Sequence, residues 1–444
     1  MRERFSLPFR PLASRGTPAE MSDHNPSPRV TASATTLIFS LWLPFSCAYF
    51  MSYALRNINA VLAPDLTHDF SLSASQLGML TSVFSLAFSL AQLPGGVMMD
   101  RFGARRVNAS LLLLAAAGCG LFASGSSLTD LVVGRALFGI GMSMCLMASI
   151  KTFSQWFSIQ RLPFATGMLL AVGGVGGMLA GAPVGWALQY VSWRTVFLVS
   201  GLMLAGSSLY LFLAVPERHQ IASKESLGSL VRGFATIVAN KTFWRINLMA
   251  AVTGAAYQGM QSLWIGPWMR DVAGYDRGQV VTMISWLALA TTVGFAGMGA
   301  VVNQLMKRGW EPLLLFKLHG ALFILLFGSI VLFGGAADWV WLVLFTLGTG
   351  GVMMFTIYAQ TFPQEWSGRV NTAANVCGFL GTFAVQWGVG VVIDRYPIID
   401  GHYDPQAYRI AMLAMWALLL AAYLWLLPMK RPEGFKSGHA VSGN

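Results

Sequence analysis

Long apolar runs alternate with short polar connections over most of the chain. Between residues 37 and 427 the pattern contains twelve apolar runs, each near the roughly 20 residues that an α-helix needs to cross a bilayer. We therefore predict an all-α integral membrane protein with twelve transmembrane helices. The predicted spans are Leu37–Ala63, Leu77–Met99, Val107–Gly125, Leu131–Phe153, Pro163–Tyr190, Thr195–Val215, Ile246–Trp268, Gln279–Met306, Pro312–Gly334, Trp339–Phe362, Val370–Ile393 and Tyr408–Leu427.

A longer polar connection divides the spans into two six-helix bundles. Within it, apolar residues recur at helical spacing, which predicts a short amphipathic helix along the inner membrane surface. These residues are Leu227, Leu230, Val231, Phe234 and Ile237. The predicted domains are an N-terminal tail (1–36), a first bundle (37–215), the linker (216–243), a second bundle (244–428) and a C-terminal tail (429–444).

The first 36 residues are polar and rich in arginine. They lack the compact apolar core and small-residue cleavage site of a signal peptide, so we predict a cytoplasmic tail. Met21 is an alternative to Met1 as the start of translation.

Lysine and arginine in the connections indicate the orientation. With the N-terminus inside, 20 of these cations fall on the inner side and 5 on the outer side. Inner loops carry such an excess, so both termini are predicted to be cytoplasmic. We expect a multi-pass protein of the plasma (cytoplasmic or inner) membrane.

Composition excludes several other classes. The chain is 55% hydrophobic and 11% charged, whereas about 25% of residues are charged in soluble proteins. The net charge of +11 comes from cations on short loops, so it predicts topology and no nucleic-acid partner. The four cysteines lie inside apolar runs without metal spacing and are interpreted as free buried thiols. No phosphate-cradling loop, zinc motif or nucleophile elbow is present, so we predict no cofactor, no metal and no enzyme activity.

The loop between spans 2 and 3 carries the most specific motif. It reads GGVMMDRFGARRV, an acid at a membrane edge followed by arginines, and the glycines would let a neighbouring helix approach closely. It resembles the G-x-x-x-D-R-x-G-x-R-R signature of the major facilitator superfamily. The matching positions are Gly96, Asp100, Arg101, Gly103, Arg105 and Arg106. The resemblance implies that the acid and the arginines pair across the two bundles and hold one conformational state; a plain topological anchor is the alternative.

The same resemblance implies an architecture of two six-span repeats with the substrate near the midplane between them. A degenerate copy of the loop motif follows span 8, with Asn303 in place of the acid. In span 5, glycines recur every four residues and are predicted to form one smooth face for packing or sliding. These are Gly173, Gly177, Gly181 and Gly185.

Cations enter the predicted spans, whereas no acid lies well inside one. The cations are Arg56, Arg135, Lys151 and Lys317, with His319 beside the last. A cation at membrane depth is costly unless it is paired or faces a watery cavity. We therefore expect an anion from outside the protein to be the partner of at least one of them. Lys151 and His319 lie near the cytoplasmic edge, where snorkelling satisfies them.

Arg56 is the strongest candidate for the anion site. Tyr53 and Tyr49 precede it by three and seven residues and share its helical face. Arginine can hold a carboxylate or phosphate with two parallel hydrogen bonds. The segment YALRNINAVLAP resembles span 1 of organic-anion members of the superfamily, including the glycerol-3-phosphate/phosphate antiporters. An arginine bonded to backbone carbonyls is the alternative interpretation.

Span 7 departs from the organophosphate pattern, in which the resemblance implies a second arginine eight residues before a bend. Counting back from Pro267 gives Gly259, so one arginine with neutral donors favours a singly charged carboxylate. Tyr257, Gln261, Trp264 and Trp268 are predicted to share a face that lines the cavity or packs in the core. In span 11, Asn375 is a predicted polar liner, and interhelical hydrogen bonding is the alternative. Arg135 lies in GRALFGIG, which resembles the superfamily's span-4 signature tied to coupling; a structural role is the alternative.

These observations predict a secondary transporter. We expect a monomer that moves a small organic anion, a carboxylate, by alternating access as proton-coupled import across the lipid bilayer. A multidrug or metabolite exporter, an inorganic-anion porter and a non-transporting sensor on the same fold are the alternatives.

Overall fold

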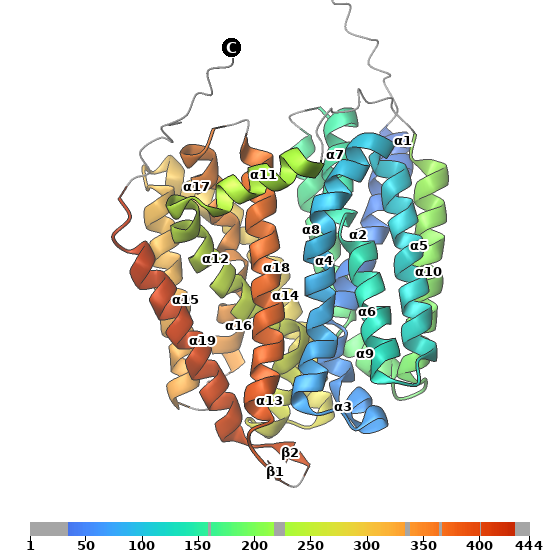
Figure 1. Cartoon of the computed structure of the whole chain (residues 1–444), viewed down its shortest axis with the longest axis vertical. Coiled ribbons are helices and arrows are strands. Elements are labelled where there is room, and N and C mark those ends of the chain that lie inside the picture. The colour runs from blue at the N-terminus through green and yellow to red at the C-terminus, as the bar shows by residue number, and fades with distance from the viewer. Residues whose placement is uncertain are drawn as a thin grey trace, which may run out of the picture.

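The computed structural model describes residues 34–158, 161–216, 227–333, 338–363, 366–399 and 401–430, and nearly all of them are helical (Figure 1). Residues 1–33 and 431–444, and with them the Met1 or Met21 start, lie outside these residues. The first half contains α1 (Ala34–Leu37), the π-helix η1 (Ile38–Trp42), α2 (Leu43–Asn57), α3 (Asn59–Phe70), α4 (Ala74–Phe102), α5 (Ala104–Ser124), α6 (Leu128–Met142), α7 (Cys145–Trp156), α8 (Leu162–Leu179), α9 (Ala182–Ala187) and α10 (Trp193–Ala214).

The second half follows the linker helix α11 (Leu227–Val238). It contains α12 (Lys241–Gly259), the π-helix η2 (Met260–Trp264), α13 (Ile265–Asp271), α14 (Arg277–Lys307), α15 (Pro312–Phe333), α16 (Asp338–Gly348), the 3₁₀-helix η3 (Thr349–Val352), α17 (Met353–Thr361), α18 (Ser367–Ile393) and α19 (Pro405–Leu426). Strands β1 (Ile398–Ile399) and β2 (His402–Tyr403) form a small antiparallel hairpin between α18 and α19.

The predicted spans are present as helices or as runs of consecutive helices. Eleven runs within the described ranges are long and apolar enough to cross a membrane. The remaining predicted span, span 7, is the continuous run of α12, η2 and α13. The all-α fold is therefore confirmed, although several spans are broken where glycine, proline or a π-turn interrupts the helix.

Side-chain caps explain where several helices begin. Ser73 and Gln76 form a capping box at the start of α4, with each side chain bonded to the other's backbone N–H. Asp276 and Gln279 do the same at the start of α14. Such caps satisfy N–H groups that the helix itself cannot.

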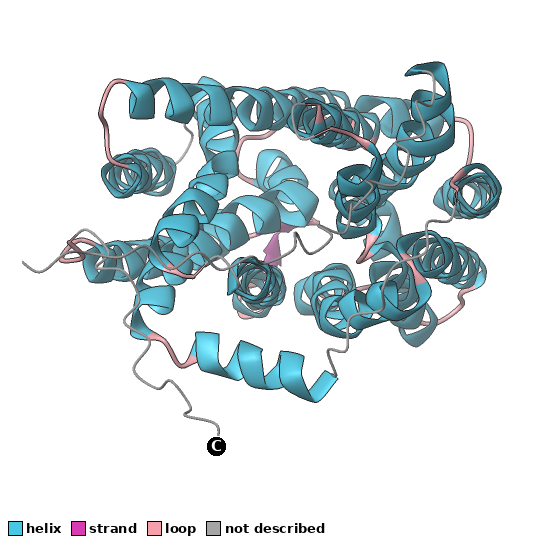
Figure 2. Ribbon diagram, turned by 90° about the horizontal axis from the view of Figure 1, so that it is seen from above, coloured by secondary structure: helices cyan, strands magenta, loops and turns pink. Residues whose placement is uncertain are grey.

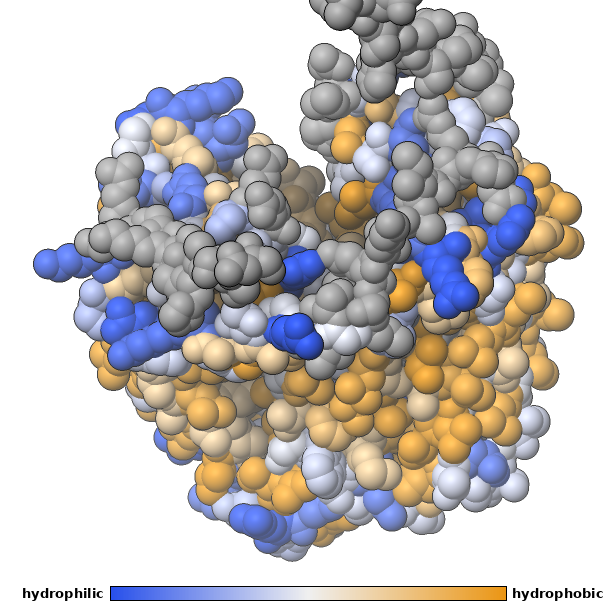
Figure 3. Space-filling view, turned by 45° about the horizontal axis from the view of Figure 1, so that its top comes forward, coloured by the Kyte–Doolittle hydropathy of each residue, from blue (hydrophilic) through white to orange (hydrophobic). Residues whose placement is uncertain are grey.

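Figure 2 shows the helices as two groups seen from above. Here the end carrying α7, α11 and α17 is called the inner end, and the end carrying α3, α13 and the hairpin the outer end (Figure 1). The names follow the charge-based orientation, which stays a prediction. In Figure 3 a deep notch separates two lobes at the inner end.

Helices α4 and α18 form the main contact between the halves. Glycine permits this approach: a Cβ on Gly78 would lie 2.7 Å from the carbonyl oxygen of Gln386, and one on Gly390 would lie 2.3 Å from that of Ala74. Backbones this close leave no room for a side chain. Helix α11 packs against both α4 and α18, so the linker contains a helix where one was predicted; its position on the membrane surface stays a prediction.

The glycines of span 5 do not form one face. The chain breaks at Gly181, between α8 and α9, so the first two glycines face α2 and the last two face α14. A Cβ on Gly173 would lie 2.5 Å from the ring of Tyr49, and one on Gly185 would lie 2.6 Å from Val281. The prediction of a single smooth face was wrong because it assumed an unbroken helix.

Candidate functional site: a caged arginine beside a polar cavity

Arg56 lies in the last turn of α2 and only 8% of it is exposed. Its guanidinium carbon lies 4.8 Å from the ring centre of Tyr53, 5.1 Å from those of Phe88 and Phe379, and 5.7 Å from that of Phe84. The face of an aromatic ring attracts a cation. Arg56 therefore occupies a cage of four rings, three from its own half and one from the other.

No hydrogen bond or ion pair of Arg56 occurs among the described residues, and its buried Nε has no partner. The alternative in which backbone carbonyls satisfy this arginine therefore does not hold for the described part of the chain. Aromatic faces compensate a buried charge only partly, since they offer no hydrogen-bond acceptor in line with the N–H groups. No described protein group therefore neutralises the charge of Arg56.

The two predicted tyrosines follow Arg56 along α2. Tyr53 contacts the guanidinium directly, and the ring of Tyr49 lies 5.1 Å from that of Tyr53. Tyr49 is 4% exposed and packs against Gly173 of α8. Tyr53 is thus beside the cation, while Tyr49 supports Tyr53 from one turn away.

A cavity of about 200 Å³ lies next to this cage, and all the residues that line it belong to the second half. Its wall includes two of the predicted site residues, Tyr257 and Asn375, together with Gln258 and Phe379. Asn375 also donates a hydrogen bond of 3.0 Å to the side chain of Gln92 on α4, so it joins the halves as well as lining the cavity.

Gln261 lies behind this wall and does not line it. Its amide nitrogen donates to the hydroxyl of Thr291 over 3.0 Å, and the Tyr257 hydroxyl lies 3.2 Å from the same oxygen. The Gln261 side-chain oxygen is buried without a described partner. The structure therefore places Gln261 as a support for Tyr257.

The tryptophans of span 7 do not line the cavity. Trp264 is fully buried and donates its indole N–H to the carbonyl of Gln386 over 2.9 Å. Trp268 packs edge-on against Trp341 at 4.9 Å. Trp264 leaves the face predicted for it because the π-helix η2 widens the turn and shifts the register.

Arg135 is buried inside the first half and does not reach the cavity. It is 0% exposed and donates a hydrogen bond of 2.8 Å to the side-chain oxygen of Asn59. Asn59 in turn donates to Thr81 over 3.0 Å. This network ties α6, α3 and α4 together, a geometry that favours the structural alternative; a coupling role stays a prediction.

The loop motif forms an ion pair within the first half. Asp100, at the inner end of α4, pairs with Lys151 of α7. Sequence reasoning had assigned Lys151 to snorkelling and missed this partner, although both residues were predicted at the inner ends of their spans. The described ion pair lies within the first half, and the pairing across the halves that the motif implied stays a prediction.

The other motif residues have distinct positions. Arg101 lies over the ring of Phe102 at 5.3 Å. Arg105 donates to the carbonyl of Val215 over 3.0 Å, and Arg106 is exposed.

Gly103 has a φ of +85°, which favours glycine at the junction of α4 and α5. A Cβ on Gly95 would collide with Met144, whereas one on Gly96 would meet nothing within 4 Å. The expected close approach therefore occurs at Gly95 and not at Gly96.

Contacts between the halves at the outer end involve charged groups. The Asp394 carboxylate, just beyond α18, accepts hydrogen bonds from the Ser73 hydroxyl (2.8 Å) and from the backbone N–H groups of Ala74 (2.7 Å) and Ser75 (3.0 Å). Arg277 of α14 pairs with Asp65 of α3 at 2.8 Å. We call the Asp394 contact the outer latch. These contacts join the halves at the outer end, whereas a notch separates them at the inner end (Figure 3).

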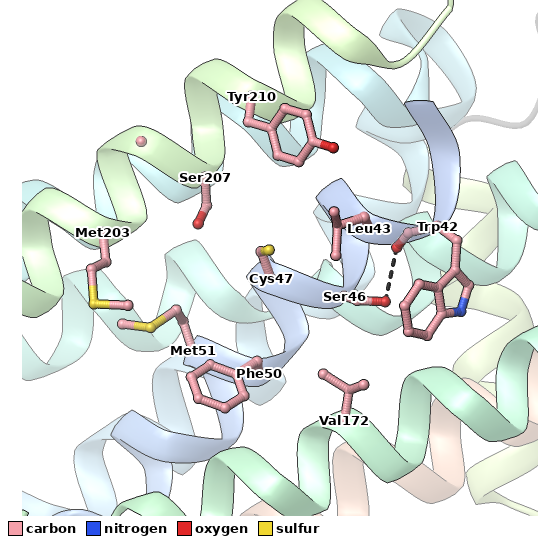
Figure 4. A pocket seen from close by; sticks show the side chains of 11 residues that line it. Trp42, Leu43, Ser46, Cys47, Phe50, Met51, Val172, Met203, Ser207 and Tyr210 are labelled. Carbon is pink, nitrogen blue, oxygen red and sulfur yellow. Dashed lines mark hydrogen bonds between the residues drawn. The ribbon is translucent and has the colours of Figure 1, made fainter. Parts of the chain in front are cut away.

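A larger cavity of about 470 Å³ lies between α2, α8 and α10 (Figure 4). Met51 and Met203 point toward each other across it, and Cys47 and Phe50 lie beside them. None of its lining residues is charged. It therefore does not suit an anion, and the polar cavity beside Arg56 is the candidate site.

The family follows from comparison with known proteins. Residues 45–386 match the Major Facilitator Superfamily, and this match covers more than half of the chain. The chain belongs to the major facilitator superfamily. It is a multi-pass membrane transporter and not an enzyme, as predicted, and its helices form the two six-span halves of that fold.

Similar superfamily members include transporters of acidic sugars. The hexuronate transporter of Escherichia coli (strain K12) is 22% identical over 415 residues, covering 86% of this chain and 92% of that protein. The galacturonate transporter of Dickeya chrysanthemi is 27% identical over 283 residues, covering 60% and 79%. A probable sulfoacetate transporter of Cupriavidus necator is 26% identical over 405 residues, covering 87% and 93%.

Solved structures of superfamily members share the fold. A bacterial homologue of the human lysosomal transporter Spinster, inward-facing and unoccupied, has a TM-score of 0.71 at 17% identity, covering 89% of this chain and 97% of that one. A D-xylose–proton symporter has a TM-score of 0.65 at 14% identity, covering 90% and 99%.

Proposed function

We propose that this superfamily member carries a small, singly charged organic acid of the uronate type by alternating access, with Arg56 holding its carboxylate. The observation behind the proposal is the cation itself: Arg56 is buried at membrane depth and has no acid or carbonyl partner among the described residues. Such a charge is costly unless a ligand completes it. A planar guanidinium fits a carboxylate with two parallel hydrogen bonds.

The neutral side of the cavity supports a hydroxylated substrate. Tyr257, Gln258 and Asn375 bring hydroxyl and amide groups to its wall, and such groups can both donate to and accept from sugar hydroxyls. The hexuronate and galacturonate carriers among the relatives are named for acids with one carboxylate and several hydroxyls.

The charge count favours a monoanion. None of the residues that line the cavity is a cation, so Arg56 is the positive charge that we assign to the substrate. A second carboxylate, as in glucarate, would remain without a partner in a partly dry site. We therefore favour uronates over dicarboxylic sugar acids.

The direction and coupling of transport belong to the same proposal. We infer proton-coupled import through the inner membrane by a monomer with both termini inside. The loop charges support the orientation. No acid lines the described cavity, so the group that carries the proton is unassigned.

Uptake into proteoliposomes tests the proposal. Labelled galacturonate, glucarate and galactose should be compared with and without an inward proton gradient. We expect galacturonate uptake to exceed that of the other two and to rise with the gradient. Binding without uptake would favour a sensor.

Arg56 variants test the anchor by calorimetry with galacturonate. Arg56→Ala should reduce affinity by at least 10- to 100-fold, because a hydrogen bond to a charged group contributes about 1.5–3 kcal/mol. Arg56→Lys keeps the charge but loses the planar fork, so it should bind with intermediate affinity. Unchanged affinity in Arg56→Ala would remove the carboxylate from this position and favour the exporter alternative.

A further inference from the structure

One wall of the Arg56 cage comes from the opposite half of the molecule. Tyr53 is on α2, and Phe84 and Phe88 are on α4 of the same half, whereas Phe379 is on α18. The Phe379 ring lies 5.1 Å from the guanidinium carbon and 4.4 Å from the Phe88 ring. The cage is therefore complete only while α18 stays in its present place.

Phe379 also separates Arg56 from the cavity. Phe379 lines the cavity of about 200 Å³, and Arg56 does not. Arg56 is only 8% exposed although no described polar group covers it. An anion that enters from the cavity therefore meets the Phe379 ring before it reaches the guanidinium.

We propose that Phe379 is a positioning residue that takes the place of the substrate carboxylate on Arg56 in the empty carrier, and that substrate binding displaces it. The inference rests on the proposed function, since it assigns the carboxylate to Arg56. A bidentate charge-assisted contact is stronger than a cation–π contact, so a carboxylate can replace the ring. A neutral sugar cannot, and the ring therefore contributes to selectivity for anions.

The exchange links binding to conformational change. Phe379 belongs to the second half, so its displacement removes a contact between α18 and the first half. A ligand shifts a conformational equilibrium only through contacts that differ between the states. Replacing a contact between the halves by a contact to substrate is such a difference.

Substitution of the ring gives the first test. In Phe379→Leu the side chain stays apolar but loses its aromatic face, so galacturonate no longer competes with it. We expect the Kd measured by calorimetry to fall about three- to tenfold, the range that corresponds to loss of one competing cation–π contact. Phe379→Tyr keeps the ring and should bind like the wild type.

Phe383→Leu is the matched control. Phe383 lies on α18 like Phe379, four residues further along, but its ring packs against that of Trp387 at 5.8 Å and does not line the cavity. Its loss should leave the Kd within about twofold of the wild-type value. A Kd that falls equally in Phe383→Leu and Phe379→Leu would overturn the inference, because the effect would then belong to the packing of α18 in general.

A second test needs no substrate. Spin labels at the inner ends of α4 and α18 report the distance between the halves in the empty protein. Phe379→Leu should broaden this distribution toward longer distances, whereas Phe383→Leu should not. An unchanged distribution together with an unchanged or raised Kd would overturn the inference. If Arg56→Ala still abolishes binding in that case, the proposed function stands without it.

Discussion

The two ends of the α4–α18 pair carry similar residues in different arrangements. The same sequence, G-V-x-x-D-R, occurs at the C-terminal end of each helix: Gly96–Arg101 lies on α4, and Gly390–Arg395 spans the end of α18. At the outer end, Asp394 crosses to the other half and caps the first turn of α4. At the inner end, the described ion pair of Asp100 stays within its own half, with Lys151.

The outer contact has a clear physical basis. A carboxylate at a helix N-terminus accepts N–H groups that the helix leaves free and interacts favourably with the helix dipole. The outer end gains these contacts from across the interface. In the structure the halves are joined at this end, and a notch separates them at the inner end (Figure 3).

Removing the outer latch should have the largest effect on this asymmetry. Asp394→Asn keeps the volume but loses the charge that strengthens its hydrogen bonds. Loss of a charge-assisted bond of about 1.5–3 kcal/mol shifts a two-state population by roughly 10- to 100-fold. Spin-label distances between the outer ends of α4 and α18 should lengthen. An outer distance like that of the wild type would show that glycine packing alone closes this end.

Substitutions in the Asp100–Lys151 ion pair should slow transport without opening the outer end. We expect Asp100→Asn to reduce galacturonate uptake severalfold in a normally inserted protein. If Lys151 is its working partner, Lys151→Met should give a similar loss and the double variant no further loss. Uptake at the wild-type rate in Asp100→Asn would make the loop motif a topological anchor.

Arg277→Gln should have a smaller effect than Asp394→Asn. The Arg277 side chain is 56% exposed and pairs with Asp65 at the surface, where ion pairs contribute about 0–1 kcal/mol and are screened by salt. The outer distance should change little at 0.15 M salt and somewhat more at low salt. If Arg277→Gln lengthens the outer distance as much as Asp394→Asn does, the Arg277–Asp65 pair contributes as much to closure of the outer end as the latch.

Lowering the pH from 7 to 5 should have the smallest effect on the outer latch. Burial of the Asp394 carboxyl acts to raise its pKa, but hydrogen bonds from Ser75 and Ser73 outweigh it, so the pKa lies below the usual aspartate value. A lowered pKa stabilises the latched state above about pH 3.9 and loses this contribution as the pH falls through the lowered value. Outer distances should therefore be equal at pH 7 and pH 5.

Local signals in the sequence were sufficient to predict the spans and to single out the loop motif and the isolated cation Arg56. Hydropathy reports membrane burial directly, and Arg56 was conspicuous because no acid accompanies it. The contact between Arg56 and Phe379 was not predictable from the sequence. The two residues are 323 positions apart, and their contact depends on how α2 and α18 pack. Lys151 was misread for a similar reason: its partner lies on another helix.

The π-helix η2 changes how span 7 should be aligned with relatives. A π-turn accommodates one extra residue, so numbering back from Pro267 no longer follows α-helical geometry. Gly259, eight positions back, points into α18, where a Cβ would lie 2.9 Å from Val385. Gln258 is the residue that faces the cavity. If η2 holds one extra residue, the position at which the organophosphate resemblance implied a second arginine moves from Gly259 to Gln258, and engineering of a dianion carrier should begin there.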